Sequence, residues 1–77
     1  MDEDEIRSLI ESGLGDCQLE LQSEGNKLML VVTAPIFTDK NRVKRQQLVY
    51  NLLKDKISTG EIHAVSMKCI SPTEAAS

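Results

Sequence analysis

The side chain best suited to metal chemistry in this chain of 77 residues is the only histidine, His63. Neutral imidazole is the commonest metal ligand among protein side chains. His63 opens a segment in which apolar and polar residues alternate, so we expect it at the start of a strand, on the apolar face. A lone histidine in such a place is more often a partly buried structural residue than a ligand, and both interpretations stay open.

The two cysteines, Cys17 and Cys69, are the other candidate metal ligands. Cys69 follows His63 on the same expected strand, and at about 3.3 Å per residue the two would lie roughly 20 Å apart. Ligands of one metal ion are only a few ångströms apart, which excludes Cys69 as a co-ligand. Cys17 begins a different expected strand and remains a candidate, since the sequence does not give its distance from His63. The simplest interpretation of both cysteines is as small buried hydrophobic residues.

Four cations crowd the expected start of a helix: Lys40, Arg42, Lys44 and Arg45. The helix dipole disfavours cations there by roughly 0.3–1 kcal/mol each. Arg42 and Arg45 also project toward the apolar side of that helix, so they must overhang the core or reach out of it. A surface for an anionic partner, such as phosphate, nucleic-acid backbone or an acidic protein, would explain both features. A solvated basic turn is the alternative.

Signals for catalysis are weak. The sequence contains no Cys-x-x-Cys, His-Glu-x-x-His, Walker or Gly-x-Ser-x-Gly motif. A cysteine hydrolase would need an oriented base and an oxyanion site, which a chain with one histidine is poorly equipped to supply. The sequence therefore predicts a binding protein and not an enzyme.

Size and composition predict a single domain over residues 1–77. No run of about 18 apolar residues exists, so no membrane-spanning helix is expected. The acidic N-terminus, Met1 to Glu5, is the opposite of a secretory signal, and two cysteines do not make a disulfide framework. We therefore expect a cytoplasmic protein without a membrane partner, either a monomer or a weak homodimer when alone.

Charge is divided unevenly along the chain. The net charge is −3, yet residues 1–24 carry eight acids and one base while residues 25–77 carry eight bases and four acids. This asymmetry suggests that different surfaces meet different partners. The alternative is that both are solvated faces.

Hydrophobic periodicity indicates the elements that would position these residues. Helical spacing is expected over residues 2–13 and from about residue 41 to residue 57, and alternation or apolar runs indicate strands over 17–23, 28–33 and 63–70. The last residues, from Ser71 onward, have the pattern of a capping box, so a short C-terminal helix is expected. The order α-β-β-α-β predicts an α+β fold with a three-stranded mixed sheet and helices packed on it.

Two segments carry a resemblance to a known family. Residues 42–50, Arg-Val-Lys-Arg-Gln-Gln-Leu-Val-Tyr, and residues 62–68, Ile-His-Ala-Val-Ser-Met-Lys, closely resemble the BolA-like family. Phe37, five residues before the first segment, and Pro72-Thr73-Glu74 after the last strand fit as well. The resemblance covers nearly the whole chain and is sharpest over residues 37–74.

The resemblance implies a fold similar to the class II K-homology fold and a specific partner. Proteins of this family pair with monothiol glutaredoxins and share a [2Fe-2S] cluster with them, in iron–sulfur cluster trafficking or iron regulation. The family's histidine in the Ile-His-Ala segment, matched here by His63, is a cluster ligand.

The chain departs from the family pattern at two positions. Members often carry a second Cys or His ligand in the loop between the first two strands, where this chain has Lys27, whose protonated amine has no lone pair for iron. Cluster ligation would then be weaker, use Cys17 or rest on His63 alone. Asp39 replaces a glycine that is common in the family. If the backbone there needs a positive φ, Asp tolerates it better than most residues, though less well than glycine. The C-terminal segment is also shorter than usual.

A nucleic-acid-binding transcriptional regulator is the alternative function. The K-homology-like fold and the cluster Lys40, Arg42, Lys44 and Arg45 favour it. The missing Gly-x-x-Gly loop, the pI of about 5.0 and the scarcity of stacking aromatics argue against it. Binding to DNA through the basic turn alone would be weak and sensitive to salt.

Overall fold

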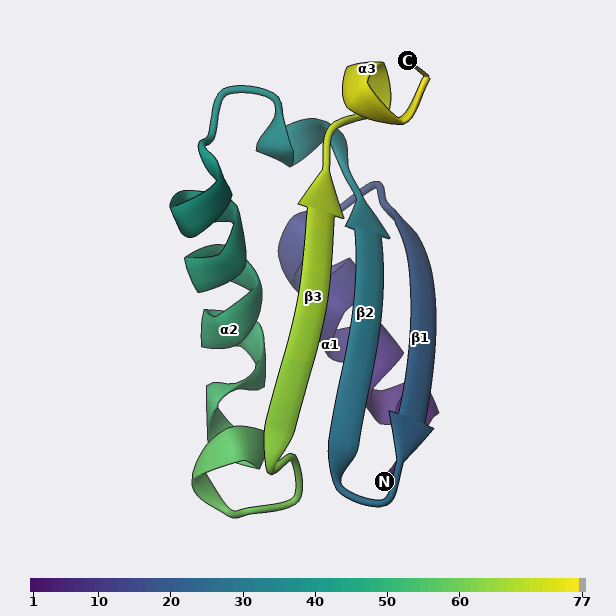
Figure 1. Ribbon diagram of the computed structural model, residues 1–77, viewed down its shortest axis with the longest axis vertical. Coiled ribbons are helices and arrows are strands. Elements are labelled where there is room, and N and C mark those ends of the chain that lie inside the picture. The colour runs from purple at the N-terminus through teal and green to yellow at the C-terminus, as the bar shows by residue number, and fades with distance from the viewer. Residues whose placement is uncertain (77) are drawn as a thin grey trace.

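The computed structural model describes residues 1–76 (Figure 1), and Ser77, the last residue of the expected domain, lies outside the described residues. Its elements, in chain order, are α1 (Glu3–Leu14), β1 (Gln18–Glu24), β2 (Lys27–Thr33), the 3-10 turn η1 (Pro35–Phe37), α2 (Arg42–Ser58), β3 (Ala64–Ile70) and α3 (Pro72–Ala75). The expected α-β-β-α-β order with a short final helix is confirmed. Among the described helices, none is long and apolar enough to cross a membrane.

The three strands form one mixed sheet in the order β1-β2-β3. β1 and β2 are antiparallel and joined by a tight turn, and Gly25 in that turn has a φ of 61°, which favours glycine. β2 and β3 are parallel, with Lys27 paired to Ala64 at one end and Thr33 paired to Ile70 at the other. A parallel pair needs a long crossover, and α2 provides it.

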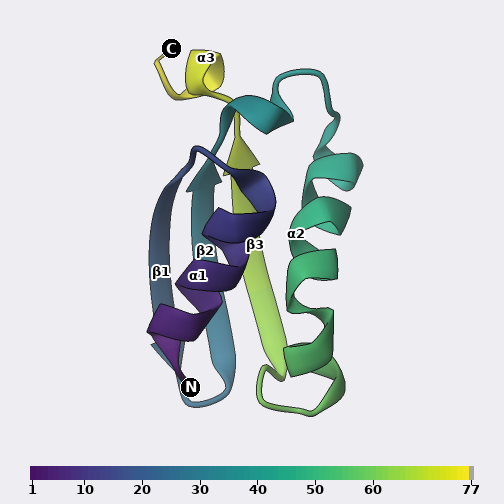
Figure 2. The same ribbon diagram turned by 180° about the vertical axis from the view of Figure 1, so that it is seen from behind.

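Both long helices lie on the same face of the sheet, and the opposite face is left uncovered (Figures 1 and 2). Alternation along the strands explains this layering, because Leu28, Leu30 and Val32 point into the core while their neighbours point out. The rest of the buried core comes from the helices and connections: Ile6, Ile10, Leu14, Ala34, Phe37, Val49, Leu53 and Ile62.

The start of α2 is fixed by Asn41, whose side-chain oxygen accepts a hydrogen bond from the backbone N–H of Lys44 at 2.9 Å. This cap satisfies one of the free N–H groups of the first turn. Asp39, just upstream, does not have a positive φ, and neither does any other described residue except glycines. The site therefore does not need a positive φ, because the chain turns here through η1 without a left-handed residue.

Candidate functional site

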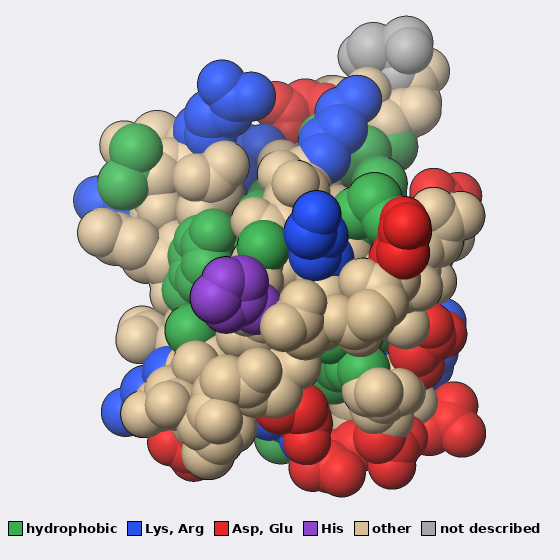
Figure 3. Space-filling model, turned by 60° about the horizontal axis from the view of Figure 1, so that its bottom comes forward, with side chains coloured by type: hydrophobic (Ala, Val, Ile, Leu, Met, Phe, Trp, Pro, Cys, Tyr) green, Lys and Arg blue, Asp and Glu red, His purple; other side chains and the backbone are tan. Residues whose placement is uncertain are grey.

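His63 lies in the connection between α2 and β3, and its side chain is exposed. The expectation that it shares the apolar face of the strand is wrong. The strand begins one residue later, at Ala64, and the buried position is taken by Ile62, which is 1% exposed. Figure 3 shows the imidazole on the surface at this end of the sheet, with hydrophobic side chains on one side and a cationic side chain nearby.

The backbone on either side of His63 is held firmly. The N–H of Ile62 donates to the carbonyl of Lys56 at 3.1 Å, and the N–H of His63 donates to the carbonyl of Asn26 at 2.7 Å. The buried Ile62 side chain adds a third anchor. The imidazole therefore projects from a fixed backbone, which is the requirement for a preorganised ligand.

An ion-pair network supports this loop from α2. The ammonium of Lys56 lies 2.7 Å from the Glu61 carboxylate and 2.5 Å from the Glu5 carboxylate of α1. Hydrogen bonds to Glu5 and Glu61 raise the pKa of Lys56, so the side chain stays charged. The network therefore links both helices to the residue that precedes the Ile62–His63 pair.

The β1–β2 turn forms the other side of the site. Lys27 pairs with Ala64 in the sheet, so the turn that contains Asn26 and Lys27 lies directly beside His63. A small hollow of about 150 Å³ lies over the paired starts of β2 and β3, with Glu24, Lys27 and Ala64 in its wall. The loop expected to carry a second ligand is thus close to His63, but its residues there, Asn26 and Lys27, are neither cysteine nor histidine.

Cys17 lies at the opposite end of the sheet. It precedes Gln18, which pairs with Thr33, whereas His63 precedes Ala64, which pairs with Lys27. Seven-residue strands span roughly 20 Å, far beyond the reach of one metal centre. The expectation that Cys17 could share a metal with His63 is therefore wrong, because the antiparallel hairpin carries the start of β1 away from the start of β3. Burial, with Glu11 and Asp16 nearby, also raises the pKa of the Cys17 thiol.

Cys69 is near the same distant end, paired with Val32. Burial raises the pKa of its thiol, so it is a poor thiolate ligand. In residues 1–76, no three His, Cys, Asp or Glu side chains are grouped so as to hold a metal ion. Neither Cys17 nor Cys69 is therefore placed to share a metal ion with His63.

The basic cluster is divided by the structure into two roles. Arg45 is nearly buried. Its side chain is 11% exposed, and its guanidinium carbon lies 5.9 Å from the Phe37 ring centroid. Its Nε donates to the carbonyls of Phe37 and Lys40, and its Nη1 donates to the carbonyl of Cys69 and the carboxylate of Glu74. Arg45 thus fastens the η1–α2 connection to the end of β3, which explains an arginine on the apolar side of the helix.

The remaining cations face solvent. Arg42 and Lys44 are exposed, and Lys40 is partly exposed with its ammonium 3.0 Å from the carbonyl of Ile36. Lys40 and Arg42 rim a groove between the start of α2 and the end of β3, where Lys68 joins them. Lys68 was not among the expected residues, because only the parallel β2–β3 pairing brings β3 to this helix.

Glu74 is a second residue whose role the sequence only half indicates. The capping box with Ser71 was expected and is present, but Glu74 also accepts a hydrogen bond from Arg45 at 2.6 Å. The backbone N–H of Ser71 and the Arg45 guanidinium lower the pKa of Glu74 to about 2. No pattern in the sequence pairs residue 45 with residue 74, since the contact depends on how α3 folds back.

Comparisons with known proteins agree with this fold. The model of the family described as BolA-like protein matches residues 10–74. The acid stress protein IbaG of Escherichia coli K12 is 33% identical over 74 residues, covering 96% of this chain and 88% of that protein. Among solved structures, a BolA homologue from Coxiella burnetii has a TM-score of 0.84 at 29% identity and covers 100% of this chain and 99% of its own. The BolA domain of SufE1 from Arabidopsis thaliana has a TM-score of 0.84 at 29% identity, over 92% of each chain. The chain belongs to the BolA-like family.

Proposed function

We propose that this protein is a binding module, not an enzyme, that pairs with a monothiol glutaredoxin and shares a [2Fe-2S] cluster with it. The observation that carries the proposal is the exposed imidazole of His63 on a fixed backbone at one end of the sheet. Family membership supports it, since the resemblance to BolA-like proteins implies that the histidine matched by His63 is a cluster ligand.

The donor set near His63 fits a shared cluster and does not fit a self-contained one. His63 can supply one nitrogen ligand, and the nearby turn supplies neither a thiolate nor a second imidazole. The other ligands would be thiolates of the partner. When bound, a [2Fe-2S] cluster supplies one-electron chemistry or serves as cargo for transfer.

This chain's own residues would orient the imidazole and set the local charge. The hydrogen bond from the His63 amide to Asn26 fixes the backbone, and the Lys56–Glu61 pair holds the preceding loop. Lys27 brings a positive charge to the strand position next to Ala64, the residue that follows His63. That charge would favour a cluster whose thiolate and sulfide ligands give it net negative charge.

The test is an anaerobic titration with a cluster-loaded monothiol glutaredoxin, followed by visible circular dichroism and by size-exclusion chromatography. We expect a mixed complex with a changed cluster spectrum for the wild type. His63→Ala should lose the spectral change, whereas Cys17→Ser should keep it, because Cys17 lies at the far end of the sheet. An unchanged wild-type spectrum with no complex on the column would overturn the proposal.

Nucleic-acid binding is a second candidate, favoured by the groove rimmed with Lys40, Arg42 and Lys68. Labelled duplex DNA titrated at several salt concentrations tests it. Arg42→Ala with Lys40→Ala should weaken binding and flatten the salt dependence, since each phosphate contact contributes about one unit of slope. Arg45 is not a suitable substitution, because it holds the fold together. No binding near physiological salt excludes this function.

A further inference from the structure

The uncovered face of the sheet has an apolar centre. Met29 of β2 is 40% exposed, and Val31 follows it on the same face. A broad, open hollow of about 740 Å³ lies over this part of the three strands. Neither helix reaches it, because both pack on the other side (Figure 1). This face of the sheet therefore packs against neither of the two long helices.

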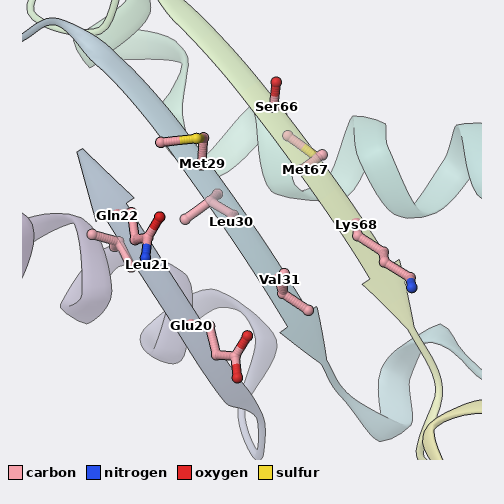
Figure 4. A pocket seen from close by; sticks show the side chains of 9 residues that line it. All are labelled: Glu20, Leu21, Gln22, Met29, Leu30, Val31, Ser66, Met67 and Lys68. Atoms are coloured by element: carbon pink, nitrogen blue, oxygen red, sulfur yellow. The ribbon is translucent and has the colours of Figure 1, made fainter. Parts of the chain in front are cut away.

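Two opposite charges flank that centre in one cross-strand row. Glu20 of β1 pairs with Val31, and Val31 pairs with Lys68 of β3. With strands about 4.8 Å apart, the Cα atoms of Glu20 and Lys68 lie roughly 10 Å from each other. Neither charged side chain has an ion-pair or hydrogen-bond partner within residues 1–76. Figure 4 shows the three residues on adjacent strands.

This pattern is complementary to itself. Consider a second copy placed face to face and related by a two-fold axis that runs parallel to β2. Rotation about this axis keeps each cross-strand row at the same position along the strands and exchanges β1 with β3. Glu20 of one copy therefore lies opposite Lys68 of the other copy, and Lys68 lies opposite Glu20. Val31 and Met29 lie near the axis and meet their own equivalents. The result is two ion pairs around a shared apolar centre, as a two-fold interface requires.

We propose that the uncovered sheet face binds a second copy of this chain, with Glu20 and Lys68 forming reciprocal intermolecular ion pairs. The neighbouring row supports the same arrangement, because Gln22 would meet Ser66, which are both exposed and able to hydrogen bond. At the end of the sheet, Lys27 would face its own equivalent, but Glu24 is its cross-strand neighbour and balances the charge. His63 precedes the strand and lies outside these rows.

The size of the face sets the strength of this dimer. Three strands of seven residues cover a patch of about 14 by 23 Å. Two such patches bury less than the roughly 1,200 Å² typical of stable complexes, so the dimer is weak and transient. Its formation should increase with protein concentration and decrease with salt, because the flanking pairs lie at the rim.

The experiment compares four charge variants by sedimentation equilibrium and by NMR chemical shifts, from about 20 µM to about 2 mM protein, a range chosen for a weak interface. Lys68→Glu and Glu20→Lys each place like charges opposite one another and should each weaken dimerisation at least about tenfold. The double variant Glu20→Lys with Lys68→Glu restores opposite pairs and should dimerise like the wild type. Lys54→Glu, on the exposed outer side of α2, makes the same charge change as Lys68→Glu away from the sheet and should have no effect.

The outcomes separate the alternatives clearly. Concentration-dependent shifts confined to Met29, Val31 and their row neighbours, with rescue by the double variant, support the proposal. A wild type that stays monomeric to about 2 mM overturns it. Dimerisation that responds to Lys54→Glu, or that the double variant fails to restore, also overturns it, because the contact then lies elsewhere or does not depend on these pairs.

Discussion

The amide of His63 donates a hydrogen bond of 2.7 Å to the carbonyl of Asn26, so the loop before β3 and the β1–β2 turn form one continuous surface. This single contact joins residues that are far apart in sequence and explains why Lys27 lies beside His63. It also places Lys27, which pairs with Ala64 in the sheet, at the strand position next to the residue that follows His63.

Replacing Lys27 with histidine should add a second ligand to the proposed cluster site. The position is exposed and at a strand end, so the change should leave the fold intact. We expect Lys27→His to slow loss of the [2Fe-2S] cluster from the mixed complex by about tenfold, through one added ligand bond. The measurement is the decay of the visible circular dichroism after a chelator is added. Lys27→Gln is the control, because it removes the charge without adding a ligand that binds iron well. Equal decay for both variants would contradict the expected geometry.

Arg45 should be one of the most sensitive positions for stability. Its guanidinium satisfies three backbone carbonyls and the Glu74 carboxylate from a nearly buried position. Arg45→Ala should lower the free energy of unfolding by about 2–4 kcal/mol, because part-buried carbonyls lose their donors and a space is left beside Phe37. Arg45→Lys should not restore the loss, since an ammonium cannot reproduce the planar fork. Urea unfolding measures both, and Arg42→Ala, at an exposed position, should change stability by less than about 0.5 kcal/mol.

Glu74 should make stability depend on acid pH. Its pKa is lowered from 4.5 to about 2 by the Ser71 N–H and the Arg45 guanidinium, so the folded state binds its proton more weakly than the unfolded chain does. The stabilisation is therefore fully present above about pH 4.5 and is lost as the pH falls through about 2. We expect Glu74→Gln to lower the midpoint of thermal unfolding at pH 7 and to converge with the wild type near pH 2.

Glu24→Gln, which changes an exposed carboxylate at the β1–β2 turn, is the matched control for that measurement. Glu24→Gln should leave the difference in the midpoint of thermal unfolding between neutral and acid pH close to that of the wild type. A Glu74→Gln variant with wild-type stability at pH 7 would show that the Arg45–Glu74 pair is fully screened by solvent.

Much of the fold follows from local patterns in the sequence. The alternation in β1, the apolar run of β2 and the helical spacing of Val49 and Leu53 each depend on neighbours within a few residues, and each led to the correct element. The capping box of Ser71 and Glu74 is equally local and was found.

The parts that could not be predicted depend on tertiary register. The distance between Cys17 and His63 follows from the direction of the hairpin, and the buried role of Arg45 follows from where β3 ends. His63 is exposed because the strand begins one residue later, at Ala64, although Val65, Met67 and Cys69 keep the expected alternation. The exact start of a strand leaves no mark on periodicity.

A side chain at Gly13 should lower the free energy of unfolding, although Gly13 lies inside α1. Glycine in a helix costs roughly 0.5–1 kcal/mol relative to alanine, so Gly13→Ala would ordinarily be stabilising. A Cβ built at Gly13, however, would lie 2.3 Å from Cδ2 and 2.6 Å from Cδ1 of Leu52 in α2. Both Leu52 atoms must move, and overpacking of this kind costs about 1–3 kcal/mol, more than the helix propensity returns. We expect Gly13→Ala to be destabilising in urea unfolding, and Gly13→Ala to become stabilising when Leu52 is also changed to alanine. If Gly13→Ala changes the free energy of unfolding in the same direction with Leu52 present and with Leu52 replaced by alanine, the helices separate at no cost. Their close approach then does not depend on this glycine.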